Sequence, residues 1–292
     1  MAKLRIGGHA VKHRSSLTNP VDLHTAGSTP YLPGTRSSDS GVGTMSEPTL
    51  DFEALEAMTN PAEVKALEGP LEKLEKDTDI LLFIAPGCTA CPHQIRAVAT
   101  LTLASERIAV EIVDATQEPE FAAQYGVRSV PTTVVDDELI MVGVIPAPEL
   151  ALRVLAHQGP DGDKVVFGSL VESGRFSDAA AHIWDGHGVE AFGELWAKST
   201  MEQRMNLFLV AEEALAAEEE CLDGLLPTLF SGLEDGGPLA QDPSRKGDTA
   251  DLLGRIGHPD ARPVLEALKG DPNPEVAEAV EDALEELGEQ PN

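Results

Sequence analysis

The sequence predicts an α/β domain, with a four-stranded mixed sheet and flanking helices, followed by an all-α domain. The first observation is an apolar run at 80–84 that ends at Pro86–Gly87 and leads directly into a helical pattern. The second is a set of apolar and β-branched runs that predict three further strands, at 107–113, 130–135 and 138–144. The third is that only helical patterns follow residue 165.

The elements of the first domain run in the order strand, helix, strand, helix, strand, strand, helix. The first of these helices follows Cys91 and reaches about residue 105, and the next two are expected at 118–125 and 148–157. Asp136–Asp137 predicts a hairpin turn between the last two strands. This order gives a parallel crossover followed by an antiparallel hairpin.

Composition divides the chain into segments. Residues 1–45 are rich in Ser, Thr, Gly and Pro and predict a disordered tail; a transit peptide, or a true start at Met45, are the alternatives. The remaining segments are the α/β domain at 46–158, a linker at 159–164, a helical region at 165–235, a loop at 236–247 and helical repeats at 248–292.

The helical repeats are predicted from a residue pattern that occurs twice in the sequence. Asp251, Leu253, Ile256 and Gly257 recur 31 residues later as Asp282, Leu284, Leu287 and Gly288. Residues 248–288 thus resemble HEAT-like repeats, and this resemblance implies a concave surface that binds a protein partner. The alternative is a plain helical domain packed on the α/β domain.

Charge and cysteine content exclude several classes of partner. The net charge of −29 argues against binding to nucleic acid or to an anionic membrane, because both require basic patches. The chain has no apolar run of about 18 residues that could span a membrane. Three cysteines without an apolar N-terminal signal argue for a reducing compartment, so we expect a cytoplasmic protein.

The chemistry of the chain centres on Cys88 and Cys91, which have C-x-x-C spacing. Such a pair can be a redox pair, half of a zinc site or a chance arrangement. Zinc needs four ligands, and the third cysteine, Cys221, lies far away in a helical region. The redox interpretation is favoured because Cys88 directly precedes a helix, whose free N–H groups stabilise a thiolate. Residues 80–105 also contain no Asp or Glu that would repel it.

The rest of the domain strengthens this interpretation. FIAPGCTACPH at 83–93, YGVRSVPTT at 125–133 and Val142–Gly143 are similar to the thioredoxin-like superfamily. The closest resemblance is to the glutaredoxin-like unit of protein disulfide oxidoreductases, over about residues 60–157.

This resemblance implies thiol–disulfide exchange with Cys88 as nucleophile and Cys91 as resolving thiol. It also implies a cis peptide bond before Pro131, which faces the cysteines, and pairing of a substrate peptide with Val130. Pro86 and Gly87 leave room for that substrate. The chemistry needs no cofactor and no metal.

Two departures leave the direction of electron flow open. Gly87 stands where thioredoxins carry Trp, and Leu82 stands where they carry a buried Asp.

The resemblance also implies protein disulfide or thiol substrates, and an unidentified thiol reductant or reductase that renews the pair. A protein partner is expected on the helical region.

The sequence is therefore compatible with two functions. The first is a thiol–disulfide oxidoreductase whose helical module binds a partner. The second is a redox-sensing or non-catalytic interaction scaffold built on thioredoxin-like and HEAT-like domains. Intact Cys88, Cys91 and Pro131 favour the first, because a scaffold would not require all three.

Other candidate residues have ordinary structural explanations. His182 and His187 are five residues apart and are not expected to share a helix face, so they predict no metal site. Trp184 and Trp196 are expected to anchor the helical core. Cys221 is expected to be a small buried apolar residue.

Overall fold

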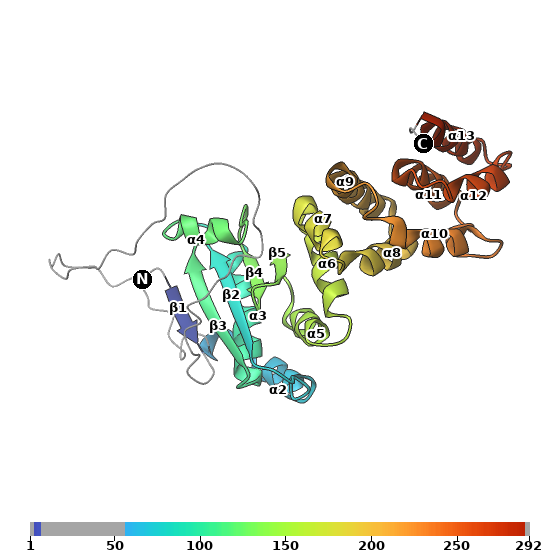
Figure 1. Cartoon of the computed structure of the whole chain (residues 1–292). Coiled ribbons are helices and arrows are strands. Elements are labelled where there is room, and N and C mark those ends of the chain that lie inside the picture. Colours follow the sequence, from blue (N-terminus) through green and yellow to red (C-terminus); the bar gives the residue numbers. More distant parts are fainter. Residues whose placement is uncertain (1–2, 7–55, 290–292) are drawn as a thin grey trace.

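The computed structural model describes residues 3–6 and 56–289, and the sheet lies at one end of the molecule (Figure 1). The sheet has the strand order β1-β3-β2-β4-β5. The strands are β1 (Lys3–Ile6), β2 (Thr78–Ile84), β3 (Ile108–Asp114), β4 (Thr132–Val135) and β5 (Leu139–Val142). β2 and β3 are parallel, and the other neighbours are antiparallel. The predicted four-stranded mixed sheet is confirmed as β2 to β5, and β1 extends it.

The edge strand β1 was not expected. It lies within residues 1–45, for which a disordered tail was predicted, and it pairs antiparallel with β3. The prediction is wrong for these four residues because a short edge strand is held by backbone pairing and needs no long apolar pattern. The other residues of this range lie outside the described residues.

Strand β2 is central because both of its faces are apolar. Ile80 and Leu82 belong to one apolar cluster, while Phe83 belongs to a second cluster on the opposite face. All three side chains are buried. A strand of this kind must lie between two others, and β2 lies between β3 and β4.

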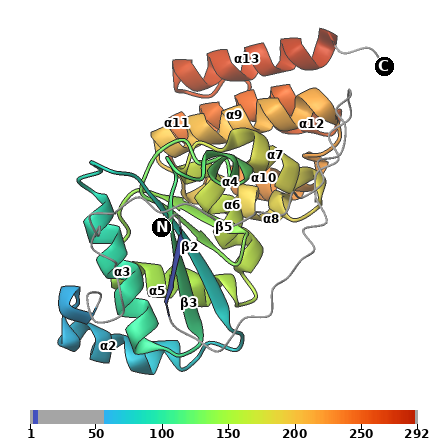
Figure 2. The same ribbon diagram turned by 90° about the vertical axis from the view of Figure 1, so that its left-hand side faces the viewer.

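Helices cover the two faces of the sheet unequally (Figure 1). The first face packs against α3 (Cys91–Ala104) and α5 (Ala147–His157), and α2 (Pro61–Leu71) packs on these two helices. The second face is covered by the short helix α4 (Pro119–Gln124) through the cluster around Phe83. Figure 2 shows α2 and α3 side by side next to the sheet.

The predicted turn between β4 and β5 is present at Asp136 and Asp137. Both residues have positive φ, at 51° and 65°. This combination is the conformation of a type I′ turn, whose twist matches that of the flanking strands. Asp tolerates it better than most residues do.

The predicted linker is shorter than expected. Helix α6 (Gly162–Glu172) begins inside the range 159–164, so only a tight turn separates it from α5. A Cβ atom at Gly162 would collide with the backbone oxygen of His157. Gly162 therefore permits this close turn, and it is not a sign of an extended linker.

The remaining helices alternate between two layers. They are α7 (Phe176–Trp184), α8 (Gly188–Lys198), α9 (Met201–Ala217), α10 (Leu226–Leu233), α11 (Pro243–Ile256), α12 (Ala261–Leu268) and α13 (Pro274–Glu289). One layer contains α7, α9, α11 and α13, and the other contains α6, α8, α10 and α12 (Figure 1). Among the described helices, none is long and apolar enough to cross a membrane.

The start of α11 corrects the predicted loop at 236–247. Residues 243–247 are helical, because Asp242 caps the helix and Pro243 occupies its first position. The Asp242 carboxylate accepts a hydrogen bond from the Ser244 amide at 2.9 Å. Helices α11 and α13 thus begin at Pro243 and Pro274, which are 31 residues apart and match the repeat found in the sequence.

The helical array is joined directly to the sheet. Helix α6 packs on β5, and the buried Ser169 hydroxyl donates a hydrogen bond to the backbone oxygen of Ile140. The guanidinium of Arg175 donates to the backbone oxygen of Tyr125 at 2.8 Å. These bonds satisfy carbonyl groups of the α/β domain with side chains of the helical region.

A buried arginine connects α9 to α11. The Arg204 guanidinium donates to the Asp248 carboxylate at 2.6 Å, to the Ser199 backbone oxygen at 3.1 Å and to the Ser244 hydroxyl at 3.0 Å. Trp196 is fully buried nearby and donates to Thr249 at 3.0 Å. Three acceptors offset the cost of removing the guanidinium from water.

Replacing Asp248 by Asn is expected to lower the free energy of unfolding by about 2 kcal/mol, because Arg204 keeps its burial and loses its charged acceptor. Urea denaturation measures this change. Asp251→Asn on the same helix is the matched control. Its partner Arg255 is more exposed, so that loss is expected to be about 0.5 kcal/mol or less. Equal losses in the two variants would contradict the role given to Arg204.

Candidate functional site

The cysteine pair lies where β2 passes into α3. The chain leaves β2 at Ile84, turns at Gly87 with a φ of 77°, and enters α3 at Cys91. The positive φ favours glycine at this turn. Pro86 and Gly87 are both exposed, so the approach to Cys88 is open on their side.

Cys88 and Cys91 are joined by a disulfide with a Cα–Cα distance of 5.5 Å. In this oxidised form neither sulfur offers a thiolate to a metal ion. The two residues differ in accessibility, since Cys88 is partly exposed whereas Cys91 is only 3% exposed. An incoming sulfur can therefore reach Cys88 more easily than Cys91.

The start of α3 provides an electropositive environment for the Cys88 sulfur. The backbone N–H of Cys91 donates a hydrogen bond to the Cys88 Sγ atom at 3.1 Å. The first turn of α3 contains no acidic residue. Free N–H groups at a helix start stabilise a nearby negative charge, so this arrangement favours a thiolate on Cys88 after reduction.

The loop before β4 lies on the other side of the sulfur. The Cys88 Sγ atom is 3.7 Å from the backbone oxygen of Val130. The peptide bond between Val130 and Pro131 is cis. Val130 is half-buried and Pro131 is buried, so the structure brings four of the predicted site residues, Cys88, Cys91, Val130 and Pro131, to one place.

Comparison with known proteins agrees with the fold of this domain. Residues 78–156 match the family model described as a thioredoxin domain. These residues form a thioredoxin-like domain. No curated protein matches the chain.

Two solved structures are similar to part of the chain. The NTD_N/C domain of alkylhydroperoxide reductase AhpF from Enterococcus faecalis is 24% identical, covers 30% of this chain and 42% of its own, and has a TM-score of 0.29. A protein disulfide oxidoreductase from Aeropyrum pernix is 24% identical, covers 34% and 43%, and has a TM-score of 0.27. The chain thus matches less than half the length of either structure.

A buried glutamine in the thioredoxin-like domain was missed by the sequence analysis. Gln94 lies one turn after Cys91, and its side-chain amide donates to the Thr133 hydroxyl at 3.0 Å. Its carbonyl oxygen accepts from the Ile145 amide at 2.7 Å. Gln94 thus ties the cysteine-bearing helix to β4 and to the segment after β5. A glutamine within an apolar helix face was the available signal.

The positions at which the sequence departs from thioredoxin have different surroundings. Leu82 is fully buried in β2 and pairs in register with Thr133 of β4. Gly87 is exposed beside Cys88. Position 82 is therefore apolar where thioredoxins carry an acidic residue. Position 87 has no side chain that could cover the Cys88 sulfur, where thioredoxins carry Trp.

The two histidines of the helical region lie close together although they do not share a helix face. His182 lies on α7, which ends at Trp184, and His187 follows the turn at Gly186, whose φ is 83°. The rings of His182 and His187 lie 5.7 Å apart. Burial lowers the pKa of His182. Within the described residues, no group of three or more His, Cys, Asp or Glu side chains could hold a metal ion.

The remaining candidates are structural. Trp196 is fully buried, as predicted for a core anchor. Trp184 remains 37% exposed and donates to the Ala214 backbone oxygen at 3.1 Å. Burial raises the pKa of the partly exposed Cys221, and the nearby Glu218 carboxylate adds to this effect. Cys221 is therefore a weaker nucleophile than an ordinary cysteine.

Replacing Gln94 by Leu is expected to lower the free energy of unfolding by about 2 kcal/mol, because it leaves the Ile145 amide and the Thr133 hydroxyl without this partner. Urea denaturation measures the loss. Gln117→Leu, at an exposed glutamine, is the control and is expected to change stability by about 0.5 kcal/mol or less. A Gln94→Leu variant as stable as this control would refute the assigned role.

Proposed function

We propose that this chain is a thiol–disulfide oxidoreductase that acts on protein disulfides through Cys88 and Cys91. The observation that carries the proposal is the setting of the Cys88 sulfur. This sulfur is partly exposed and accepts a hydrogen bond from the Cys91 amide at 3.1 Å. It lies 3.7 Å from the Val130 backbone oxygen. The buried Cys91 stands directly behind it.

The proposed reaction proceeds through a mixed disulfide. In the reduced enzyme the Cys88 thiolate attacks one sulfur of a substrate disulfide, and the other substrate sulfur leaves as a thiolate that takes up a proton. The Cys91 thiolate then attacks Cys88, which forms the Cys88–Cys91 disulfide and releases the second substrate thiol. The substrate gains two electrons and the cysteine pair loses two.

The surrounding residues have distinct proposed roles. The Val130 backbone pairs with an extended substrate peptide, as an added strand would, and Pro131 holds this backbone beside the sulfur. Pro86 and Gly87 leave room for the substrate chain. A thiol reductant or reductase returns the pair to the dithiol form, and no organic cofactor takes part. The expected compartment is the cytoplasm, where thiols are kept reduced.

The helical region is proposed to be a HEAT-like array that presents a protein partner. Its alternation between two layers supports this proposal, as does the 31-residue offset between α11 and α13.

The enzyme is expected to accelerate the reduction of insulin by dithiothreitol. Cys88→Ser is expected to lower the rate to that of dithiothreitol alone, because the attacking sulfur is lost. Cys221→Ser is the matched control and should retain the wild-type rate, since Cys221 lies outside the site. A rate that is equal in wild type and Cys88→Ser would refute the enzyme and favour the scaffold function.

Cys91→Ser is expected to trap substrate proteins as mixed disulfides, because the resolving thiol is absent while Cys88 can still attack. Non-reducing electrophoresis of an extract, followed by mass spectrometry, detects covalent adducts that dithiothreitol releases. The double variant that also carries Cys88→Ser must lose them. Adducts that persist in this double variant would show that capture does not occur at Cys88.

A further inference from the structure

Helix α9 presents a row of apolar side chains at the surface. Met201, Met205 and Leu209 follow one another at intervals of four residues, which places them along one side of the helix. Their exposed fractions are 69%, 55% and 45%. The row is therefore apolar surface that the described parts of the chain leave open.

The row runs alongside α11. Three residues after each member of the row comes a side chain that contacts α11. Residues three apart are neighbours on a helix surface. These contacting residues are Arg204, which binds Asp248, Phe208, which packs under Arg255, and Glu212, which pairs with Arg255. The apolar row thus lies next to the groove side of α11.

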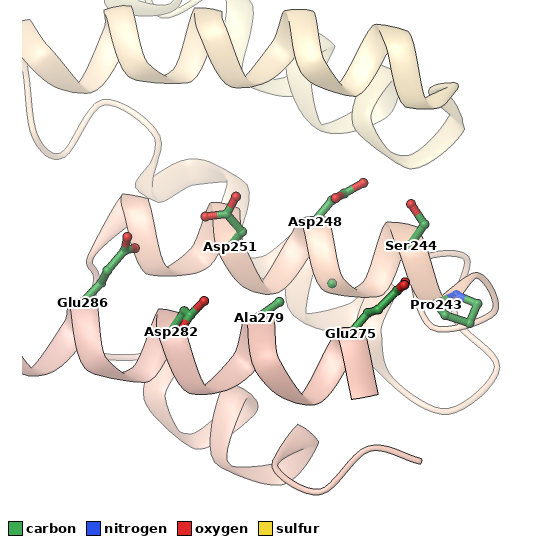
Figure 3. A pocket seen from close by; sticks show the side chains of 9 residues that line it. Pro243, Ser244, Asp248, Asp251, Glu275, Ala279, Asp282 and Glu286 are labelled. Atoms are coloured by element: carbon green, nitrogen blue, oxygen red, sulfur yellow. The ribbon is translucent and has the colours of Figure 1, made fainter. Parts of the chain in front are cut away.

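Next to this row, carboxylates line a groove between α11 and α13. The groove has a volume of about 340 Å³, and Figure 3 shows its lining side chains on the two helices. Its acidic members are Asp248 and Asp251 on α11, which pair with Arg204 and Arg255, and Glu275, Asp282 and Glu286 on α13. The surface therefore combines an apolar row on α9 with carboxylates whose negative charge lies chiefly on α13.

We propose that this surface binds a basic amphipathic helix of a partner protein. The apolar face of such a helix would cover Met201, Met205 and Leu209, and its Lys or Arg side chains would reach the carboxylates of the groove. Methionine side chains are flexible and polarisable, so they adapt to apolar partners of different shape. The proposal is independent of the thiol chemistry at Cys88.

The charge of the surface decides against other occupants. Nucleic acid and anionic membranes carry negative charge, which the groove carboxylates repel. A second copy of this chain would bring a further groove of the same sign against the first, in a chain whose net charge is −29. A basic helix is the occupant whose charge and apolar face both match.

The test uses the full chain and a dye-labelled helical peptide of roughly 18 residues, five turns, with leucines on one face and lysines on the other. Fluorescence anisotropy is expected to show saturable binding that weakens as salt concentration rises. A peptide of the same composition, scrambled so that no apolar face forms, is expected to bind at least about tenfold more weakly. Absence of saturable binding, or equal binding of both peptides, would overturn the proposal.

Variants of the protein test the surface itself. The triple variant Met201→Gln, Met205→Gln, Leu209→Gln is expected to bind the peptide at least about tenfold more weakly, because the buried apolar contact is lost. Leu152→Gln is the matched control, since Leu152 is a 65% exposed leucine on α5. Circular dichroism checks that both fold. If the triple variant binds like the control, the row is not the binding surface.

A second pair of measurements tests the carboxylates and the competing occupant. Glu275→Gln with Asp282→Asn is expected to weaken binding and to reduce its dependence on salt; an unchanged salt dependence would remove the groove from the proposal. Sedimentation of the protein alone is expected to show a monomer. A dimer that the triple variant dissociates would assign the row to a second copy and overturn the proposal.

Discussion

The register between β2 and β4 holds the site together. Phe83 pairs with Thr132, so the residues that precede β4 lie beside the residues that follow β2. These two segments contain Pro131 and Cys88, which are more than forty residues apart in the sequence. A slip by one residue would reverse the faces of β4 and move Val130 away from the sulfur. The buried Gln94 side chain fixes the helix that follows against the same strand.

Much of this arrangement could be predicted because it depends on local patterns. The apolar run of β2, the glycine turn and the C-x-x-C spacing are contiguous, and Asp136–Asp137 is a recognisable turn. The polar residue Gln94 stands out in an apolar helix face, but its partners could not be predicted, since they come from segments that are distant in the sequence. The strand β1 is too short for its pattern to be informative. The proximity of His182 and His187 depends on where α7 ends.

In the helical region the sequence predicted the kind of structure better than its boundaries. The 31-residue repetition in the sequence falls on α11 and α13, whose first residues are also 31 positions apart. The cap formed by Asp242 and Pro243 lies in a polar, glycine-rich stretch, and such a composition predicts a loop. Arg204 gave no sign of its burial, since the acceptors that permit it lie on other elements or at helix ends.

The hydrogen bond from Ser169 to Ile140 bears on what happens when the thioredoxin-like domain is separated from the helical region. The outer edge of a sheet presents unpaired backbone groups that recruit strands from other molecules. Here α6 lies along β5, and the serine hydroxyl occupies an edge carbonyl. Leu139, Met141 and Phe167 also belong to one apolar cluster that extends from the sheet into the array. A fragment ending near residue 158 would expose both the edge and this apolar surface. The helical array therefore also protects the sheet from aggregation.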